Sequence, residues 1–228
     1  MMRTRIIALG LVLLAGEVWA EAAAEPAKEG ESRPVVTRLF NGEDFAGWKL
    51  FVPDPNVAPE TVWEVRDGVV HCKGQPAGYM RTTQAFSDYR LEFEWRWLEQ
   101  PGNSGVLLHI TGEDKVWPKS IEAQLKSGDA GDFWVIDGTD FKEHVNKDER
   151  RVPKKAESNE KPIGDWNKME IECQGNTIRV YVNGLLQNEA TETTVERGYI
   201  GFQSEGAPIE FRNIVLKRSL PAPPAEGK

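Results

Sequence analysis

Two polar side chains, Glu122 and Gln124, alternate with the apolar residues Ile121, Ala123 and Leu125 in one short stretch of the chain. Such alternation predicts a β-strand, in which successive side chains point to opposite faces of the sheet. Glu122 and Gln124 should therefore share one face, about 6–7 Å apart along the strand. A carboxylate partly shielded from water has a raised pKa and suits proton abstraction near neutral pH. The neighbouring amide can hydrogen-bond sugar hydroxyls, but it cannot act as a base.

His109 is the second candidate catalytic residue, and it lies in the short apolar run Val106–Ile110. Strict alternation places it on the same face as Leu107, so it could lie near Glu122 if the two strands expose the same face. An imidazole there could share acid–base work or bind a metal ion. A hydrogen-bonded structural histidine is the alternative. The cofactor requirement stays open, because Glu122 could also bind a divalent metal ion instead of acting as a base.

Other polar and aromatic residues are candidates for binding a sugar. Gln203 and Glu205 repeat the two-residue spacing of the first pair, and Trp134 in a polar loop could stack on a sugar ring. Lys126 and Arg81 could polarise a keto oxygen. For Glu122 and Gln124 the alternative is a solvated face, and for Asn103 and Ser104 it is an ordinary turn. The substrate-binding candidates are Gln124, Asn103, Ser104, Gln203, Glu205, Trp134 and Lys126.

The strands that must position these residues recur along most of the chain. Tyr89–Trp97 alternates apolar with charged residues over its whole length, and the Asp67-Gly68 and Asn183-Gly184 pairs are typical of hairpin turns. We therefore predict an all-β sandwich of two antiparallel sheets, with Trp95 and Trp97 in its core. The exception is the polar segment 126–165, which we interpret as a long loop forming a lid or rim beside the binding face. Its aspartates do not have the spacing of a calcium loop and are expected to be solvated; they are Asp129, Asp132, Asp137 and Asp140.

The first residues of the chain predict export, and its net charge argues against nucleic acid as a partner. Residues 1–20 have the basic start, apolar run and small-residue end of a signal peptide, so we expect an exported protein, periplasmic or extracellular. Residues 21–34 form a linker, residues 35–218 the domain and residues 219–228 a Pro-rich tail. The net charge of −8 argues against nucleic acid as a partner, and no apolar run is long enough for a membrane span. The expected partner is a small carbohydrate.

Cys72 and Cys173 are the two cysteines of the chain, and each lies in a strand-like run. Export permits a disulfide between them. Two buried free thiols are the alternative. Their spacing matches no metal-binding motif.

Several short motifs occur in a specific order from the start of the domain to its end. Together they resemble the 3-keto-disaccharide hydrolase domain family, long known as a domain of unknown function, over about residues 36–218. The motifs are Leu39-Phe40-Asn41-Gly42, Gly47-Trp48, Trp63-Glu64-Val65-Arg66-Asp67-Gly68, Asn103-Ser104-Gly105, Glu122-Ala123-Gln124-Leu125, Trp166-Asn167, Val182-Asn183-Gly184, Gly201-Phe202-Gln203-Ser204-Glu205-Gly206 and Phe211-Arg212-Asn213-Ile214.

The resemblance implies a concanavalin A-like jelly roll whose concave sheet holds carbohydrate. It also implies an exported hydrolase of 3-keto-glycosides, in which the ketone acidifies the C2 proton, the C1 substituent is eliminated and water then adds. One departure is the segment Ser204-Glu205-Gly206, where the family often has an acidic residue and a histidine before the glycine. If that histidine serves the family's chemistry, either Glu205 replaces it or the role is absent from this chain. The alternative function is a non-catalytic glycan-binding module on the same β-sandwich.

Overall fold

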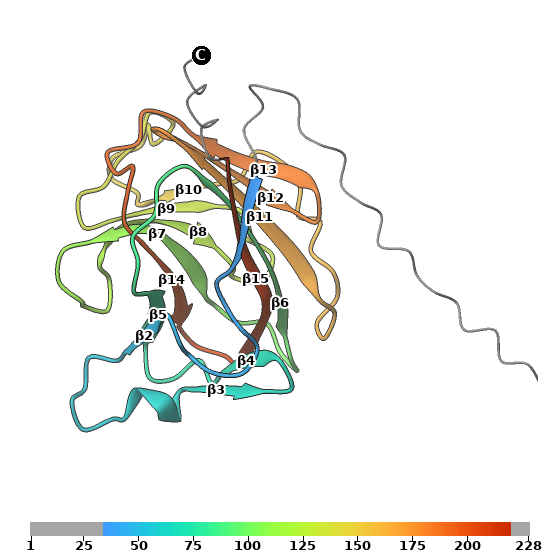
Figure 1. The fold of residues 1–228 in the computed structure, drawn as a ribbon. Coiled ribbons are helices and arrows are strands. Elements are labelled where there is room, and N and C mark those ends of the chain that lie inside the picture. Colours follow the sequence, from blue (N-terminus) through green and yellow to red (C-terminus); the bar gives the residue numbers. More distant parts are fainter. Residues whose placement is uncertain (1–33, 220–228) are drawn as a thin grey trace, which may run out of the picture. The chain divides into compact units, whose positions relative to one another are not determined.

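The computed structural model describes residues 34–219, which form two antiparallel β-sheets (Figure 1). The expected signal peptide (1–20), nearly all of the expected linker (21–34) and nearly all of the expected tail (219–228) lie outside the described residues. Within the described part of the chain, no helix is long and apolar enough to cross a membrane. The one helical segment there is a single 3-10 turn, η1 (Pro59–Thr61).

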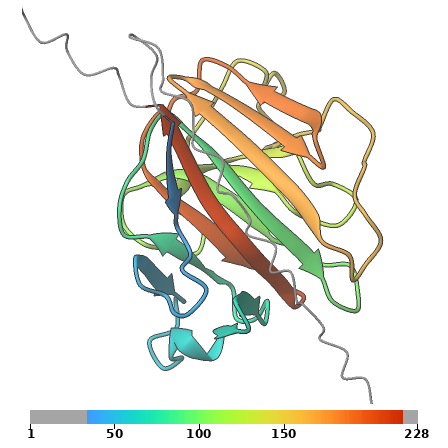
Figure 2. The same cartoon turned by 45° about the vertical axis from the view of Figure 1, so that its right-hand side comes forward.

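The larger sheet has the strand order β13-β12-β11-β6-β15-β4-β3, with β1 paired to the far part of β15. Figure 2 shows its long strands running side by side across the front of the domain. Its strands are β1 (Pro34–Arg38), β3 (Trp63–Arg66), β4 (Val69–Cys72), β6 (Tyr89–Trp97), β11 (Asn167–Gln174), β12 (Thr177–Val182), β13 (Leu185–Ala190) and β15 (Ile209–Ser219).

The second sheet has the order β10-β9-β8-β7-β14-β5-β2. Its register places Glu122 of β8 opposite Leu107 of β7 on one side and opposite Trp134 of β9 on the other. Its strands are β2 (Trp48–Phe51), β5 (Gly78–Thr82), β7 (Gly105–Thr111), β8 (Lys119–Gln124), β9 (Phe133–Ile136), β10 (Arg151–Val152) and β14 (Tyr199–Ser204). The segment 126–165 is thus not purely a loop, because β9 and β10 extend the sheet within it.

The core lies between the two sheets and follows the sequence alternation. In β6, Tyr89, Leu91, Phe93, Trp95 and Trp97 are all buried, whereas the charged residues between them are partly exposed. The inner face of the second sheet contributes its own alternate residues, among them Ile121, Ala123, Phe202 and Met80. The predicted two-sheet sandwich and its aromatic core are therefore confirmed.

Strand β7 breaks this alternation at His109. The backbone of His109 has φ = +57°, and the pairing of β7 with β8 shifts register between Leu108 and Thr111. Such a bulge places one extra residue in a strand and changes which face the following side chains occupy. As a result Leu107 and Ile110 both pack in a small apolar cluster apart from the main core, while Leu108 packs in the core.

Both cysteines are buried free thiols, Cys72 on β4 and Cys173 on β11. Burial raises the pKa of each thiol, that of Cys173 to about 12. The structure therefore bears out the free-thiol alternative. Because a thiol reacts as its thiolate, thiols with such raised pKa values are unreactive, and the two cysteines serve packing.

Candidate active site

A small cavity of about 120 Å³ opens on the face of the second sheet that points away from the core. Its floor is β8, since Glu122 and Gln124 alternate with the core residues Ile121 and Ala123. Side chains from several separate segments line it: Asn103, Trp117, Glu122, Gln124, Trp134, Ile136, Arg150 and Glu205. The structure therefore brings five of the expected site residues together in one place, namely Glu122, Gln124, Asn103, Trp134 and Glu205.

The Glu122 carboxyl is buried at the base of this cavity, with only 5% of the residue exposed. It lies against Gly105, where an added Cβ would fall 2.2 Å from Oε1 of Glu122 and 2.6 Å from Oε1 of Gln203. No atom of residues 34–219 hydrogen-bonds Oε1 of Glu122. The Gln203 amide is close enough to lower the pKa of the carboxyl, but it makes no hydrogen bond of ordinary geometry with it. An unpartnered buried oxygen of this kind is costly unless a ligand or a proton occupies it.

Two carboxyls with perturbed pKa values share the cavity. Burial, followed by the nearby charge of Glu205, raises the pKa of Glu122 to about 8. Burial also raises the pKa of Glu205 to about 7, against a smaller lowering by the Arg150 guanidinium. At neutral pH Glu122 is thus mostly protonated, which suits a proton donor better than the base expected from the sequence.

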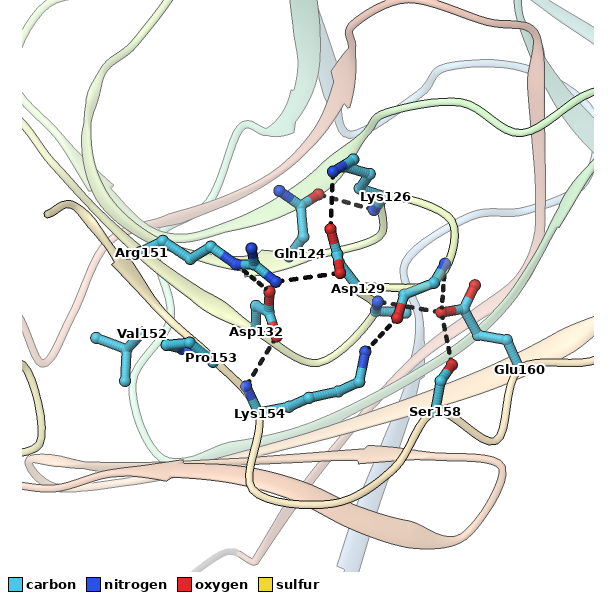
Figure 3. A network of polar contacts seen from close by, with 12 residues as sticks. Gln124, Lys126, Asp129, Asp132, Arg151, Val152, Pro153, Lys154, Ser158 and Glu160 are labelled. Atoms are coloured by element: carbon cyan, nitrogen blue, oxygen red, sulfur yellow. Dashed lines mark hydrogen bonds and ion pairs between the residues drawn. The ribbon is translucent and has the colours of Figure 1, made fainter.

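The Gln124 side chain has a fixed orientation. Its Oε1 accepts hydrogen bonds from the backbone N–H of Leu125 (2.9 Å) and of Lys126 (2.8 Å). The opposite amide orientation would set NH₂ against two N–H donors, so the nitrogen must point the other way. Figure 3 shows Nε2 turned away from this turn. Within the described chain Nε2 makes no hydrogen bond, and it is free to donate into the cavity.

A network of ion pairs holds the turn that follows Gln124 (Figure 3). Asp132 is fully buried and accepts hydrogen bonds from Nε of Arg151 (2.6 Å) and from the backbone N–H of Lys154 (2.8 Å). Asp129 pairs with Arg151 (3.1 Å) and with Lys126 (2.8 Å). The expectation of solvated loop aspartates was wrong for the buried Asp132, whereas Asp137 and Asp140 are exposed or partly exposed and pair with lysines.

Three lining residues were missed by the sequence analysis: Trp117, Ile136 and Arg150. Trp117 is 41% exposed, which is unusual for so large an apolar side chain in a core-rich chain. The Arg150 guanidinium lies 5.4 Å from the ring centroid of Trp134. Neither Trp117 nor Arg150 belongs to a periodic pattern. The abundance of tryptophan is the one sequence feature that could have suggested Trp117 as a sugar-binding residue.

His109 lies on the inner side of the sheet, away from the cavity. Its ring packs edge-on against the core residue Tyr89 at 5.7 Å, and Nδ1 lies 3.1 Å from the carbonyl of Val195. Burial lowers its pKa, which disfavours a charged imidazole. The bulge described above is the reason that the expected sharing of a face with Leu107 was wrong. The geometry matches the structural alternative.

Four other candidates also lie outside the lining. Lys126 is exposed and paired with Asp129, and Ser104 is buried with its hydroxyl donating to the carbonyl of Gln203 at 2.9 Å. Arg81 is held by Asp114 through two hydrogen bonds of 2.8 and 3.1 Å. Gln203 adjoins Glu122 and Gly105 from behind the lining rather than forming part of it.

A second, larger cavity of about 480 Å³ lies by the larger sheet, where β6, β11 and β15 supply lining residues. Its arginines and acids are mostly paired with each other, for example Arg90 with Glu172 and Glu170. Its Tyr89 and Cys173 have strongly raised pKa values because they are buried. It therefore lacks the free carboxyls that mark the smaller cavity, in spite of its size.

The described residues hold no group of three or more His, Cys, Asp or Glu side chains arranged to bind a metal ion. The cavity offers two carboxyls, Glu122 and Glu205, and the one cationic group beside them is Arg150. Two carboxyls beside a guanidinium are a poor set of ligands for a divalent cation, which prefers six or more oxygen ligands.

Comparison with known proteins assigns the chain to a family. Residues 36–217 match the family described as the 3-keto-alpha-glucoside-1,2-lyase-like domain. The chain belongs to this family. The match spans every residue of the cavity and all of both sheets except the outer ends of β1 and β15, so the resemblance seen in the sequence motifs is confirmed.

The chain is also similar to individual known proteins. A protein of Bacteroides thetaiotaomicron named 3-keto-disaccharide hydrolase is 24% identical, over 78% of this chain and 77% of its own length. A crystal structure from Parabacteroides distasonis, with the provisional name of glycosyl hydrolase, superposes with a TM-score of 0.61 and 22% identity, over 81% of this chain and 94% of that one. The β-glucanase of Bacillus licheniformis shares the fold at a TM-score of 0.53 and 15% identity, over 85% of this chain and all of its own. The expected jelly-roll fold is thereby confirmed.

Proposed function

We propose that this protein is a carbohydrate-active hydrolase that cleaves 3-keto-glycosides, with Glu122 and Glu205 as its acid–base pair. The family match and the name of the Bacteroides thetaiotaomicron relative support the substrate class. The single observation that carries the chemistry is that two carboxyls with raised pKa values line one small cavity. Pairs of titratable groups whose environments separate their pKa values are typical of acid–base sites.

Cleavage of a 3-keto-glycoside by elimination requires one base and one acid. The C3 ketone acidifies the hydrogen on C2, which the base removes. The C2–H electron pair forms the C1=C2 double bond as the C1–O bond breaks, and the acid protonates the departing glycosidic oxygen. Water then adds to C1 while a proton returns to C2, so the net reaction is hydrolysis. This differs from the oxocarbenium-like route of ordinary glycosidases, which also use two carboxyls.

The difference in burial assigns these roles, because Glu122 is buried whereas Glu205 is partly exposed. Between pH 7 and 8 the pair holds about one proton, which resides mainly on Glu122 because its pKa is about 8 and that of Glu205 about 7. Ionised Glu205 is then the base for C2, and protonated Glu122 is the acid for the glycosidic oxygen. Burial of Glu122 favours its neutral form, as an acid requires. Trp134 and Trp117 supply apolar surface for the sugar ring at the cavity rim.

Turnover tests the reaction class. The purified protein should release sugar from a 3-keto-disaccharide and leave the unoxidised parent disaccharide intact. If no 3-keto-glycoside is cleaved, and the sugar nevertheless binds, the protein is the glycan-binding module that the sequence also allows. If neither cleavage nor binding occurs, the proposed function is wrong.

Leaving-group dependence tests the roles. A 4-nitrophenolate leaves without protonation, whereas an alkoxide needs an acid. Glu122→Gln should therefore retain turnover of an aryl 3-keto-glycoside and lose turnover of an alkyl one. Glu205→Gln should lose both. The opposite pattern would make Glu122 the base, as the sequence alone suggests, and would contradict the assignment of Glu122 as the acid.

Export is part of the proposal and rests on the leader-like residues 1–20. The protein purified from the cell envelope or medium of its host should begin at residue 21. A cytoplasmic protein that retains residues 1–20 would refute this.

A further inference from the structure

We propose that Gln124 is the residue that distinguishes a C3 ketone from a C3 hydroxyl, by presenting a hydrogen-bond donor that cannot turn into an acceptor. This inference rests on the proposed function and deepens it, because it names the group that recognises the oxidised position. From the sequence, Gln124 was expected to hydrogen-bond sugar hydroxyls in general.

The donor is fixed by the hydrogen bonds of the other end. Gln124 is 4% exposed, and its Oε1 is engaged by two backbone N–H groups at 2.9 and 2.8 Å. Rotating the amide would break both bonds and leave two donors facing an NH₂ group. A free glutamine can offer either atom to a ligand. This one offers only Nε2.

Backbone hydrogen bonds also fix the position of the segment that carries Gln124. The N–H of Gln124 donates to the carbonyl of Asp132 at 2.9 Å, and the N–H of Gly131 donates to the carbonyl of Gln124 at 3.0 Å. The Leu125 N–H also donates to the carbonyl of Ser104 at 2.8 Å. The ion pairs of Arg151 with Asp132 and Asp129 close the turn from outside (Figure 3).

A fixed donor fits a ketone better than an alcohol. A ketone oxygen only accepts, whereas a hydroxyl also carries a proton that needs an acceptor of its own. Removal of the C2 proton places negative charge on the C3 oxygen, so a donor aimed there strengthens its bond as the reaction proceeds. Gln124 lies one repeat along β8 from Glu122, about 6–7 Å away, which is close enough for both side chains to contact one sugar ring.

Two substitutions separate this role from a structural one. When ionised, the new carboxylate of Gln124→Glu keeps an oxygen to accept the two backbone N–H groups and removes the donor, whereas Gln124→Met removes both. The ligands are 1,5-anhydroglucitol and its 3-keto derivative, which have no leaving group and so report binding alone. The exposed Gln84 provides the matched control, Gln84→Glu.

We expect wild type and Gln84→Glu to bind the ketone at least about tenfold more tightly than the alcohol, in line with one hydrogen bond of about 1.4 kcal/mol. Both Gln124 variants should lose this ratio. Gln124→Glu should also lose about 100-fold in kcat on a 3-keto-glycoside, the usual effect of removing one such donor. Thermal unfolding should show that Gln124→Glu remains folded.

Two outcomes would contradict the inference, and a third would separate it from the proposed function. If wild type binds both ligands equally, no ketone donor is present. If Gln124→Glu keeps the ratio and only Gln124→Met loses it, Gln124 serves the turn alone. If wild type prefers the ketone through Gln124 but cleaves no 3-keto-glycoside, the proposed function fails while the recognition of the ketone stands.

Discussion

Replacing Glu122 with glutamine should stabilise the folded protein at alkaline pH, although it removes a proposed catalytic group. The carboxyl is buried without a hydrogen-bond partner for Oε1 among the described residues, so ionisation inside the fold is unfavourable. Its pKa is about 8 in the folded protein, against 4.5 for an unperturbed glutamate. The unfolded chain therefore releases this proton at lower pH than the folded protein does, and the folded state loses stability as pH rises from about 4.5 to about 8.

The size of this effect follows from the same two pKa values. One pKa unit corresponds to about 1.4 kcal/mol, so the rise from 4.5 to about 8 costs the folded protein up to about 5 kcal/mol once both states are ionised. A neutral glutamine does not ionise. The free energy of unfolding of Glu122→Gln should thus exceed that of wild type by several kcal/mol at pH 9, and by little or nothing at pH 4.5.

Urea unfolding at half-unit steps from pH 4.5 to pH 9 measures this difference directly. The exposed Glu196 supplies the matched control, because Glu196→Gln replaces a carboxyl on the surface rather than a buried one. A difference between wild type and Glu122→Gln that stays flat over the whole range would refute the buried, proton-binding carboxyl on which the site depends.

Three other perturbations probe the cavity and its support. Gly105→Ala should destabilise the protein by about 1–3 kcal/mol and abolish turnover, because its Cβ would fall 2.2 Å from Oε1 of Glu122; unchanged unfolding and kinetics would contradict this close packing. Asp132→Asn should cost about 2 kcal/mol in unfolding free energy by weakening the buried pair with Arg151, and unchanged urea unfolding would mean that the pair does not hold the turn. The pH profile of kcat/KM should be bell-shaped, rising through about 7 as Glu205 ionises and falling through about 8 as Glu122 loses its proton; a profile that keeps rising above pH 8 would contradict Glu122 as the acid.

Much of the fold could be predicted because alternation is a local property of the sequence. β6 and β8 bury the residues that their period of two assigns to the core, so Glu122 and Gln124 were placed on one face correctly. Large aromatic side chains such as Trp95 were predicted to lie in the core between the two sheets, and Trp95 is buried there. The polar loop was recognised as the rim of a site, but its strands β9 and β10 are too short and mixed to show a period.

The parts of the site that could not be predicted depend on long-range geometry. The alternation rule failed at His109 because a single bulge with positive φ changes which face of the sheet the following side chains occupy. No local sequence pattern predicts this bulge. Arg150 and Trp117 reach the cavity from loops, where spacing gives no direction. Asp132 is buried because Arg151, on a separate strand, neutralises it, and such pairing is visible only in three dimensions.

The fate of the C2 hydrogen tests the central claim most directly. Hydrolysis of a 3-keto-disaccharide in D₂O, followed by mass spectrometry and NMR of the released 3-keto sugar, reports whether the C2–H bond is broken during cleavage. Elimination and hydration predict one deuterium at C2 for each bond cleaved, at a rate far above that of a control without protein and lost in Glu205→Gln. Release of sugar that retains its C2 hydrogen would show direct displacement at C1 and would contradict the proposed mechanism.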